Sequence, residues 1–274
     1  MAVPYRKLLS ILAGASLGCS VTMSGPAFAA CSSQKLKEGV VEQVIDAATL
    51  QLDDGSKVRL VGALPPQTPP WWKEKRDWPP GTSAKNLLEK LVAGKKVILR
   101  VDPAEPERDR HDRFLAQVHV LNGVEETWVQ GEMINAGFAR TYSFPAHKSC
   151  ARNLLAREDS ARRGMRGLWR AGHFKVFDAG KVETLMKQRG EFVLVEGLVV
   201  SVGKTRNWTY LNFSRDWRTD FTVSIASGNR KNFEDHDMPL AMLEGKRVRV
   251  RGWIGRWNGP VIKADHAEQI ELLP

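Results

Sequence analysis

The chain has 274 residues, which at about 150 residues per domain is nearly two domains and excludes a single small module. Hydrophobic residues make up 42% and charged residues 26%, a globular composition that excludes a disordered chain. Lys and Arg number 41 against 31 Asp and Glu, a formal net charge of +10, which favours an anionic partner, nucleic acid before a membrane surface.

Residues 1–29 are predicted to be a cleaved secretory signal peptide. Arg6 and Lys7 form a short basic region, and a mostly apolar run follows over residues 8–17. Ala27-Phe28-Ala29 then places small residues at the −3 and −1 positions that signal peptidase requires. The apolar run is too short to span a bilayer, and no later run of the sequence approaches about 20 apolar residues. We therefore expect a secreted, periplasmic protein without a transmembrane segment.

The three cysteines are Cys19, Cys31 and Cys150. Cleavage of the signal peptide would remove Cys19 and leave an even pair in an oxidising compartment, which predicts a Cys31–Cys150 disulfide. Two alternatives stay open. The two thiols are unpaired, or the protein is a lipoprotein whose lipid-bearing residue is Cys19 or Cys31.

Apolar spacing indicates the strands and helices of the first half. Residues 39–62 alternate with the two-residue period of strands, and Asp54-Gly55 supplies a hairpin turn between them. The stretch 64–80 contains six prolines and three tryptophans and is therefore predicted to be a loop. Further along we expect a helix over 83–93, strands over 97–101 and 113–121, and helices over 127–137 and 150–163.

A second group of strands follows a polar connector, which is predicted over residues 171–190 and has room for one short helix. Strands are expected over 192–202, 207–214, 220–227, 246–257 and 260–272, with one helical stretch near 230–243. Five strands with a helix between the third and the fourth are typical of an OB barrel. We therefore predict an OB-like domain over 191–274.

Three motifs of the first half carry a family resemblance: I-D-A-A-T at 45–49, R-L-V-G-A-L-P-P-Q at 59–67 and D-R-H-D-R at 109–113. Together with the order of the expected elements and a final G-L-W at 167–169, they resemble the thermonuclease (staphylococcal-nuclease-like) family over roughly residues 38–170. The resemblance implies an OB-type five-stranded barrel with three helices, assigned to residues 30–170. The whole chain is therefore predicted to be β-rich α+β. The family's activity is calcium-dependent cleavage of phosphodiesters.

The residues that the family uses for calcium and for proton transfer are replaced in this chain. The resemblance places Ala48 and Leu64 where the family has calcium-binding Asp residues, and Gln67 where it has the general-base Glu. Calcium requires several oxygen ligands, which Ala and Leu side chains lack, and an amide is not basic enough to take a proton from water. We therefore expect no intact catalytic residues, no calcium or other cofactor, and a catalytically degenerate homologue.

Two arginines that grip phosphate in the family, Arg59 and Arg113, survive. A guanidinium matches the oxygens of a phosphate, so both are candidate remnants of a phosphate-binding site. One alternative is that these arginines pair with the nearby carboxylates of Asp46, Asp109 or Asp112. Another is that the same three carboxylates and His111 form a relocated metal site. The six histidines show no metal-ligand spacing.

The second half offers a candidate nucleic-acid-binding surface. Alternation along two of its strands puts basic and aromatic side chains opposite the apolar face: Arg247, Arg249, Arg251, Trp253, Trp208 and Tyr210. OB barrels hold single strands with cations along the phosphates and rings stacked on the bases. The alternative is a solvated face with the aromatics packed against the first domain. The chain is thus predicted to bind nucleic acid or another polyanion. An active nuclease with an altered metal site, and a structural or protein-interaction module, are the competing hypotheses.

Overall fold

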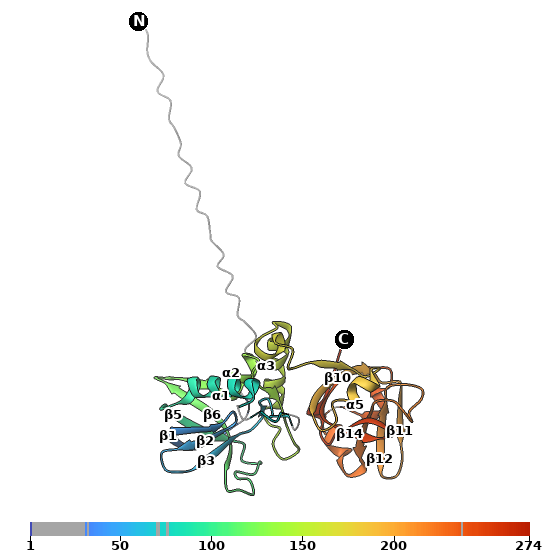
Figure 1. The fold of residues 1–274 in the computed structure, drawn as a ribbon, viewed down its shortest axis with the longest axis horizontal. Coiled ribbons are helices and arrows are strands. Elements are labelled where there is room, and N and C mark those ends of the chain that lie inside the picture. The colour runs from blue at the N-terminus through green and yellow to red at the C-terminus, as the bar shows by residue number, and fades with distance from the viewer. Residues whose placement is uncertain (2–30, 32, 70–71, 75–76, 237) are drawn as a thin grey trace.

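The computed structural model describes residues 1, 31, 33–69, 72–74, 77–236 and 238–274. The predicted signal peptide, apart from its first residue, lies outside these ranges, and so does Cys19. None of the helices within them has the length and apolar character that a bilayer crossing requires. Two β-barrels stand side by side, the first blue to green and the second yellow to red (Figure 1).

The first barrel is built from the strands β1 (Gln34–Asp46), β2 (Thr49–Leu52), β3 (Lys57–Leu60), β5 (Lys96–Val101) and β6 (Phe114–Asn122). β1 pairs with β2 on one side and with β5 on the other. β2 pairs with β3, and β5 pairs with β6. A parallel pairing of β3 with β6 closes the ring. The predicted five-stranded barrel is therefore confirmed.

The helices α1 (Pro79–Val92), α2 (Val129–Asn135) and α3 (Ala151–Arg163) pack on this barrel. α1 begins earlier than predicted because Pro79 and Pro80 occupy its first turn. Proline is tolerated there, since the N–H groups of the first turn have no partner within the helix. Further along, Leu88 and Val92 are fully buried in the same core as the strands.

Short elements complete the first half. β4 (Ala63–Leu64) pairs with β8 (Arg140–Thr141), β7 (Glu125–Trp128) forms a hairpin with β6, and α4 (Gly167–Arg170) follows α3. As predicted, Cys31 and Cys150 form a disulfide, with their Cα atoms 4.9 Å apart. This bridge ties the segment before β1 to the N-terminus of α3.

The second barrel repeats the strand order of the first with β10 (Phe192–Leu198), β11 (Ser201–Lys204), β12 (Trp208–Asn212), β13 (Thr222–Ala226), β14 (Arg247–Trp257) and β15 (Gly259–Lys263). β10 and β11 are two halves of one predicted strand, bent so that β10 pairs with β14 and β11 with β12. β12 pairs with β13, which pairs in parallel with β15, and β15 pairs with β14. Inward side chains such as Leu211, Val223 and Ile262 form the core.

The second half differs from the prediction in two places. The segment 171–190 contains, besides the short helix α5 (Val182–Met186), a strand β9 (Val176–Asp178) that pairs in parallel with β10. The single strand predicted over 260–272 is two strands, β15 and β16 (Ile270–Leu272), separated by a 3₁₀ turn. At the break, the Asp265 N–H donates to the side-chain oxygen of Gln269 in place of a strand partner. The predicted helical stretch is α6 (Lys231–Glu234), flanked by 3₁₀ turns.

A buried interface joins the two barrels. Its apolar part is a cluster of side chains from both: Leu64, Ala161, Leu168, Trp169, Phe174, Phe192 and Leu194. Its polar part centres on Arg251 of β14, which is 2% exposed. Nη1 of this arginine donates to Glu158 Oε2 on α3 (2.5 Å) and to the Thr141 carbonyl (3.1 Å). Because buried polar groups need such partners, these contacts fix how the barrels dock.

Candidate nucleic-acid interface

A cleft of about 390 Å³ on the first barrel has two of the predicted site residues, Arg59 and Gln67, in its lining, whereas Arg113, Ala48 and Leu64 are not part of that lining. Ala48 is 1% and Leu64 4% exposed, so the two positions at which the family has calcium-binding Asp residues carry interior apolar side chains. The Gln67 amide donates to the Pro65 carbonyl (3.0 Å). Calcium requires several oxygen ligands, and this set of residues does not fit the ion.

Each of the two predicted phosphate-binding arginines has a carboxylate neighbour. Arg113 binds Asp109 through Nη2 (2.6 Å) and Nε (2.8 Å). Burial by itself would raise the pKa of Asp109, but hydrogen bonds from Arg113 and from backbone N–H groups lower it. Arg59 Nη1 lies 3.8 Å from Asp46 Oδ1. The pKa of Arg59 is lowered, chiefly by burial and also by the positive charge of Arg113. The carboxylates of Asp46 and Asp109 raise it, but by less.

The residues of the suggested relocated metal site are not gathered together. Asp112 pairs with Arg108 (2.9 Å), and His111 Nε2 accepts a hydrogen bond from Arg110 (3.1 Å). In the described part of the chain, no three side chains of His, Cys, Asp or Glu are grouped closely enough to hold a metal ion.

Two of the three arginines predicted to follow a phosphate backbone are buried. Arg251 is 2% and Arg249 6% exposed. Arg249 Nη2 pairs with Glu196 (2.6 Å), and Arg251 pairs with Glu158 on α3 (2.5 Å). Alternation did place both on the face opposite the core, but α3 covers that face. The prediction that Arg249 and Arg251 contact phosphates was therefore wrong, and Arg247 alone of the three is exposed.

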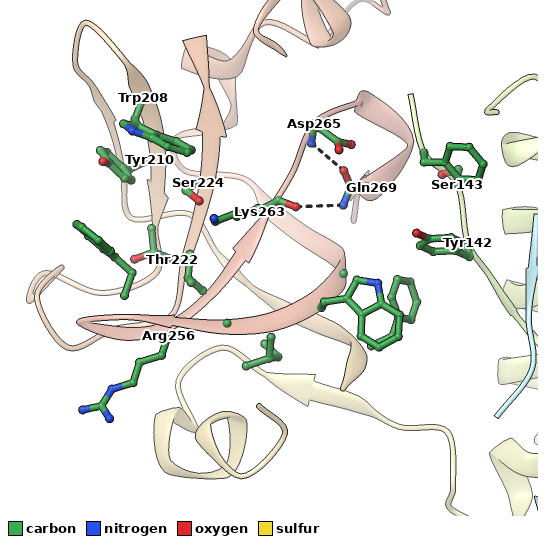
Figure 2. A pocket seen from close by; sticks show the side chains of 18 residues that line it. Tyr142, Ser143, Trp208, Tyr210, Thr222, Ser224, Arg256, Lys263, Asp265 and Gln269 are labelled. Atoms are coloured by element: carbon green, nitrogen blue, oxygen red, sulfur yellow. Dashed lines mark hydrogen bonds between the residues drawn. The ribbon is translucent and has the colours of Figure 1, made fainter. Parts of the chain in front are cut away.

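The predicted aromatic residues line a groove of about 590 Å³ on the outer face of the second barrel. Trp208 and Tyr210 project outward from β12, because they alternate with the buried Thr209 and Leu211. Their rings stack with centroids 6.5 Å apart and planes at 25°, and Figure 2 shows them together at one side of the groove. Trp253 on β14 is 45% exposed and lines the same groove. The structure thus places the three predicted aromatic residues in one groove.

The groove also contains cations and hydroxyls that sequence reasoning did not single out. Lys263 of β15 lies in its centre, with Ser224 beside it and Arg256 at its edge (Figure 2). Among the described residues, neither Lys263 nor Arg256 has a carboxylate within ion-pair distance. The signal that could have found Lys263 is its position directly after the core residue Ile262, which puts its side chain on the opposite, outer face of β15.

The far wall of the groove comes from the first barrel. Tyr142, Ser143 and Phe144, which follow β8 in the chain, line the groove, and Figure 2 shows Tyr142 and Ser143 on the side opposite β12. Ser143 Oγ lies 2.7 Å from His266 Nε2 of the second barrel. Sequence reasoning missed these residues because their place in the groove depends on how the two barrels dock.

Residues 57–171 match the family model described as staphylococcal nuclease homologue. An uncharacterized protein of Methanocaldococcus jannaschii is 27% identical over 150 residues, which span 48% of this chain and 70% of the relative. The match over 57–171 confirms the predicted resemblance and the OB-type barrel of the first half. A domain of a nuclease family supports a nucleic-acid-related role.

Proposed function

We propose that this protein is a secreted, periplasmic nucleic-acid-binding protein that does not cleave its ligand. One observation carries the binding: outward-facing rings of Trp208, Tyr210 and Trp253 line the same groove as the cation Lys263 on an OB-like barrel. Stacking of a base on an aromatic ring contributes about 1–3 kcal/mol, and cations beside the rings attract phosphates. The groove offers both kinds of contact within the same surface.

The first barrel supports the non-catalytic part of the proposal. A calcium ion has no carboxylate at the buried positions 48 and 64, and the amide of Gln67 stands where a general base would be needed. The Cys31–Cys150 disulfide supports secretion, because disulfides persist in oxidising compartments.

Fluorescence anisotropy with a labelled oligo(dT) of about 12 nucleotides, within the site size of OB folds, tests the binding. Trp253→Ala should weaken the affinity about 5- to 150-fold, the equivalent of one lost stacking contact. Lys263→Ala should lower the slope of log affinity against log salt by about 0.7. Trp217→Ala is the matched control, because Trp217 is 50% exposed and lies outside the groove. Absence of binding at low salt would contradict the proposal.

Incubation of the same oligonucleotide with calcium or with a chelator tests the non-catalytic part. We expect intact oligonucleotide under both conditions. Chelator-sensitive cleavage that disappears in Arg113→Ala would instead support a nuclease with an altered metal site.

A further inference from the structure

A row of outward side chains crosses the second barrel from one edge of the groove to the other. Tyr210 stands opposite Ser224 in the β12–β13 register, and Ser224 opposite Lys263 in the β13–β15 register. The antiparallel β14–β15 register, continued by one residue, puts Lys263 opposite Trp253. Three steps between strands, each about 4.8 Å, place the backbone positions of Tyr210 and Trp253 about 14 Å apart along the sheet. The row therefore has a ring at each end and a cation between them.

Ring contacts continue from Trp253 into the first barrel. The centroids of Trp253 and Phe192 are 5.7 Å apart, those of Phe192 and Tyr142 5.6 Å, and those of Tyr142 and Phe144 6.0 Å. Phe192 is buried, whereas Tyr142 and Phe144 are partly exposed and line the groove. One end of the row is thus a ring pair on β12, and the other is an aromatic wall shared by both barrels.

Buried contacts hold this wall in place. The two neighbours of Tyr142 in the chain both bind the second barrel: the Thr141 carbonyl accepts a hydrogen bond from Arg251 (3.1 Å), and Ser143 Oγ lies 2.7 Å from His266 Nε2. Separation of the wall from the second barrel would break these hydrogen bonds and expose to water the apolar cluster against which Tyr142 packs, and both changes are unfavourable. These contacts place the wall against the second barrel as one side of the groove.

We infer that the groove is a composite site for single-stranded nucleic acid, in which bases stack at both ends of the row and the phosphates between them pass Lys263 (Figure 2). The inference rests on the proposed function. Stacked neighbouring bases are about 3.4 Å apart, much less than the spacing of about 14 Å between the strand positions that carry the two rings, so two adjacent bases in a stack do not match this spacing. A duplex cannot open its stack to this spacing without unpairing, whereas a single strand can. For the shortest tight-binding ligand we expect about 4 nucleotides, the lower end of OB-fold site sizes.

Anisotropy competition with unlabelled oligo(dT) of increasing length tests the inference on the full chain. The affinity should rise steeply between two and about 4 nucleotides, and an oligo(dT)·oligo(dA) duplex should compete poorly. Phe144→Ala and Tyr142→Ala should weaken single-strand binding about 5- to 150-fold. Tyr142→Phe keeps the ring and should bind like the wild type, which separates loss of stacking from loss of folding. Trp217→Ala again serves as the control.

The outcomes distinguish the two proposals. If Trp208→Ala weakens binding while Phe144→Ala and Tyr142→Ala do not, the composite site is refuted and the proposed function stands. Equal competition by the duplex refutes the single-strand preference in the same way. If the wild type binds no oligonucleotide at low salt, both proposals fail.

Discussion

The buried guanidinium of Arg251 is the polar centre of the contact between the barrels, and its removal tests how firmly they are joined. The side chains of Arg251 and Glu158 are each 2% exposed, with Nη1 and Oε2 2.5 Å apart. Burial by itself would lower the pKa of Arg251, but Glu158 and Glu271 raise it overall. Arg251→Met leaves Glu158 buried without its partner, which should cost about 3–5 kcal/mol of unfolding free energy. At about 2–4 °C per kcal/mol for a chain of this size, Tm falls by about 6–20 °C.

Thermal and urea unfolding of matched variants measures this loss. The double variant Arg251→Met/Glu158→Leu should recover most of the stability, because apolar side chains then replace both buried charges. Arg247→Met is the control: Arg247 is on the same strand with a side chain 58% exposed, and its replacement should change stability by no more than about 0.5 kcal/mol. A loss below about 1 kcal/mol in Arg251→Met, or additive losses in the double variant, would refute the reasoning.

Three further variants test other parts of the structure. Cys150→Ser opens a bridge between residues 119 apart and should lower the unfolding free energy by about 4–5 kcal/mol in the chain-entropy model, measured with urea under oxidising conditions. Leu64→Asp puts a carboxylate into a buried apolar cluster, so it should lose more than about 2 kcal/mol and show no rise of Tm with calcium. His119 has its pKa lowered to about 4, chiefly by burial. The unfolded chain binds this proton more readily than the folded chain. The contribution of His119 to the free energy of unfolding is therefore fully present above about pH 6.5 and is lost as the pH falls toward 4. His119→Gln should flatten that part of the pH profile of urea unfolding, and an unchanged slope would contradict burial as the cause.

Strand alternation predicted the strands of both barrels because it is a local property. Val223, for example, is a core residue with polar neighbours on both sides in the sequence. The same alternation placed Arg249 and Arg251 opposite the core, yet it contains no information about what covers that face. The covering helix brings Glu158, which is 93 residues from Arg251 in sequence. A pairing at that distance depends on domain docking, and no local pattern reports it.

Only part of the groove could be predicted, because local patterns reveal residues on the outer face of a strand but not residues that another domain contributes. Trp208 and Trp253 were identified because large aromatics on the outer face of a strand are conspicuous in the sequence. Lys263 was missed because a single lysine between apolar residues is an ordinary feature of a surface strand. Tyr142 and Phe144 were missed because they belong to the first barrel and enter the groove only where the two barrels meet.

Leu64 occupies a position of the family's calcium site and also belongs to the interface between the two barrels. The resemblance places a calcium-binding Asp at this position, but the Leu side chain is 4% exposed and packs in one cluster with Phe192 of the second barrel. Phe192 in turn contacts Trp253, a ring of the groove. A charged carboxylate is disfavoured in such a cluster, so one residue cannot serve both a calcium ion and this interface. The apolar side chain that removes a calcium ligand therefore also helps to build the wall on which we propose that bases stack.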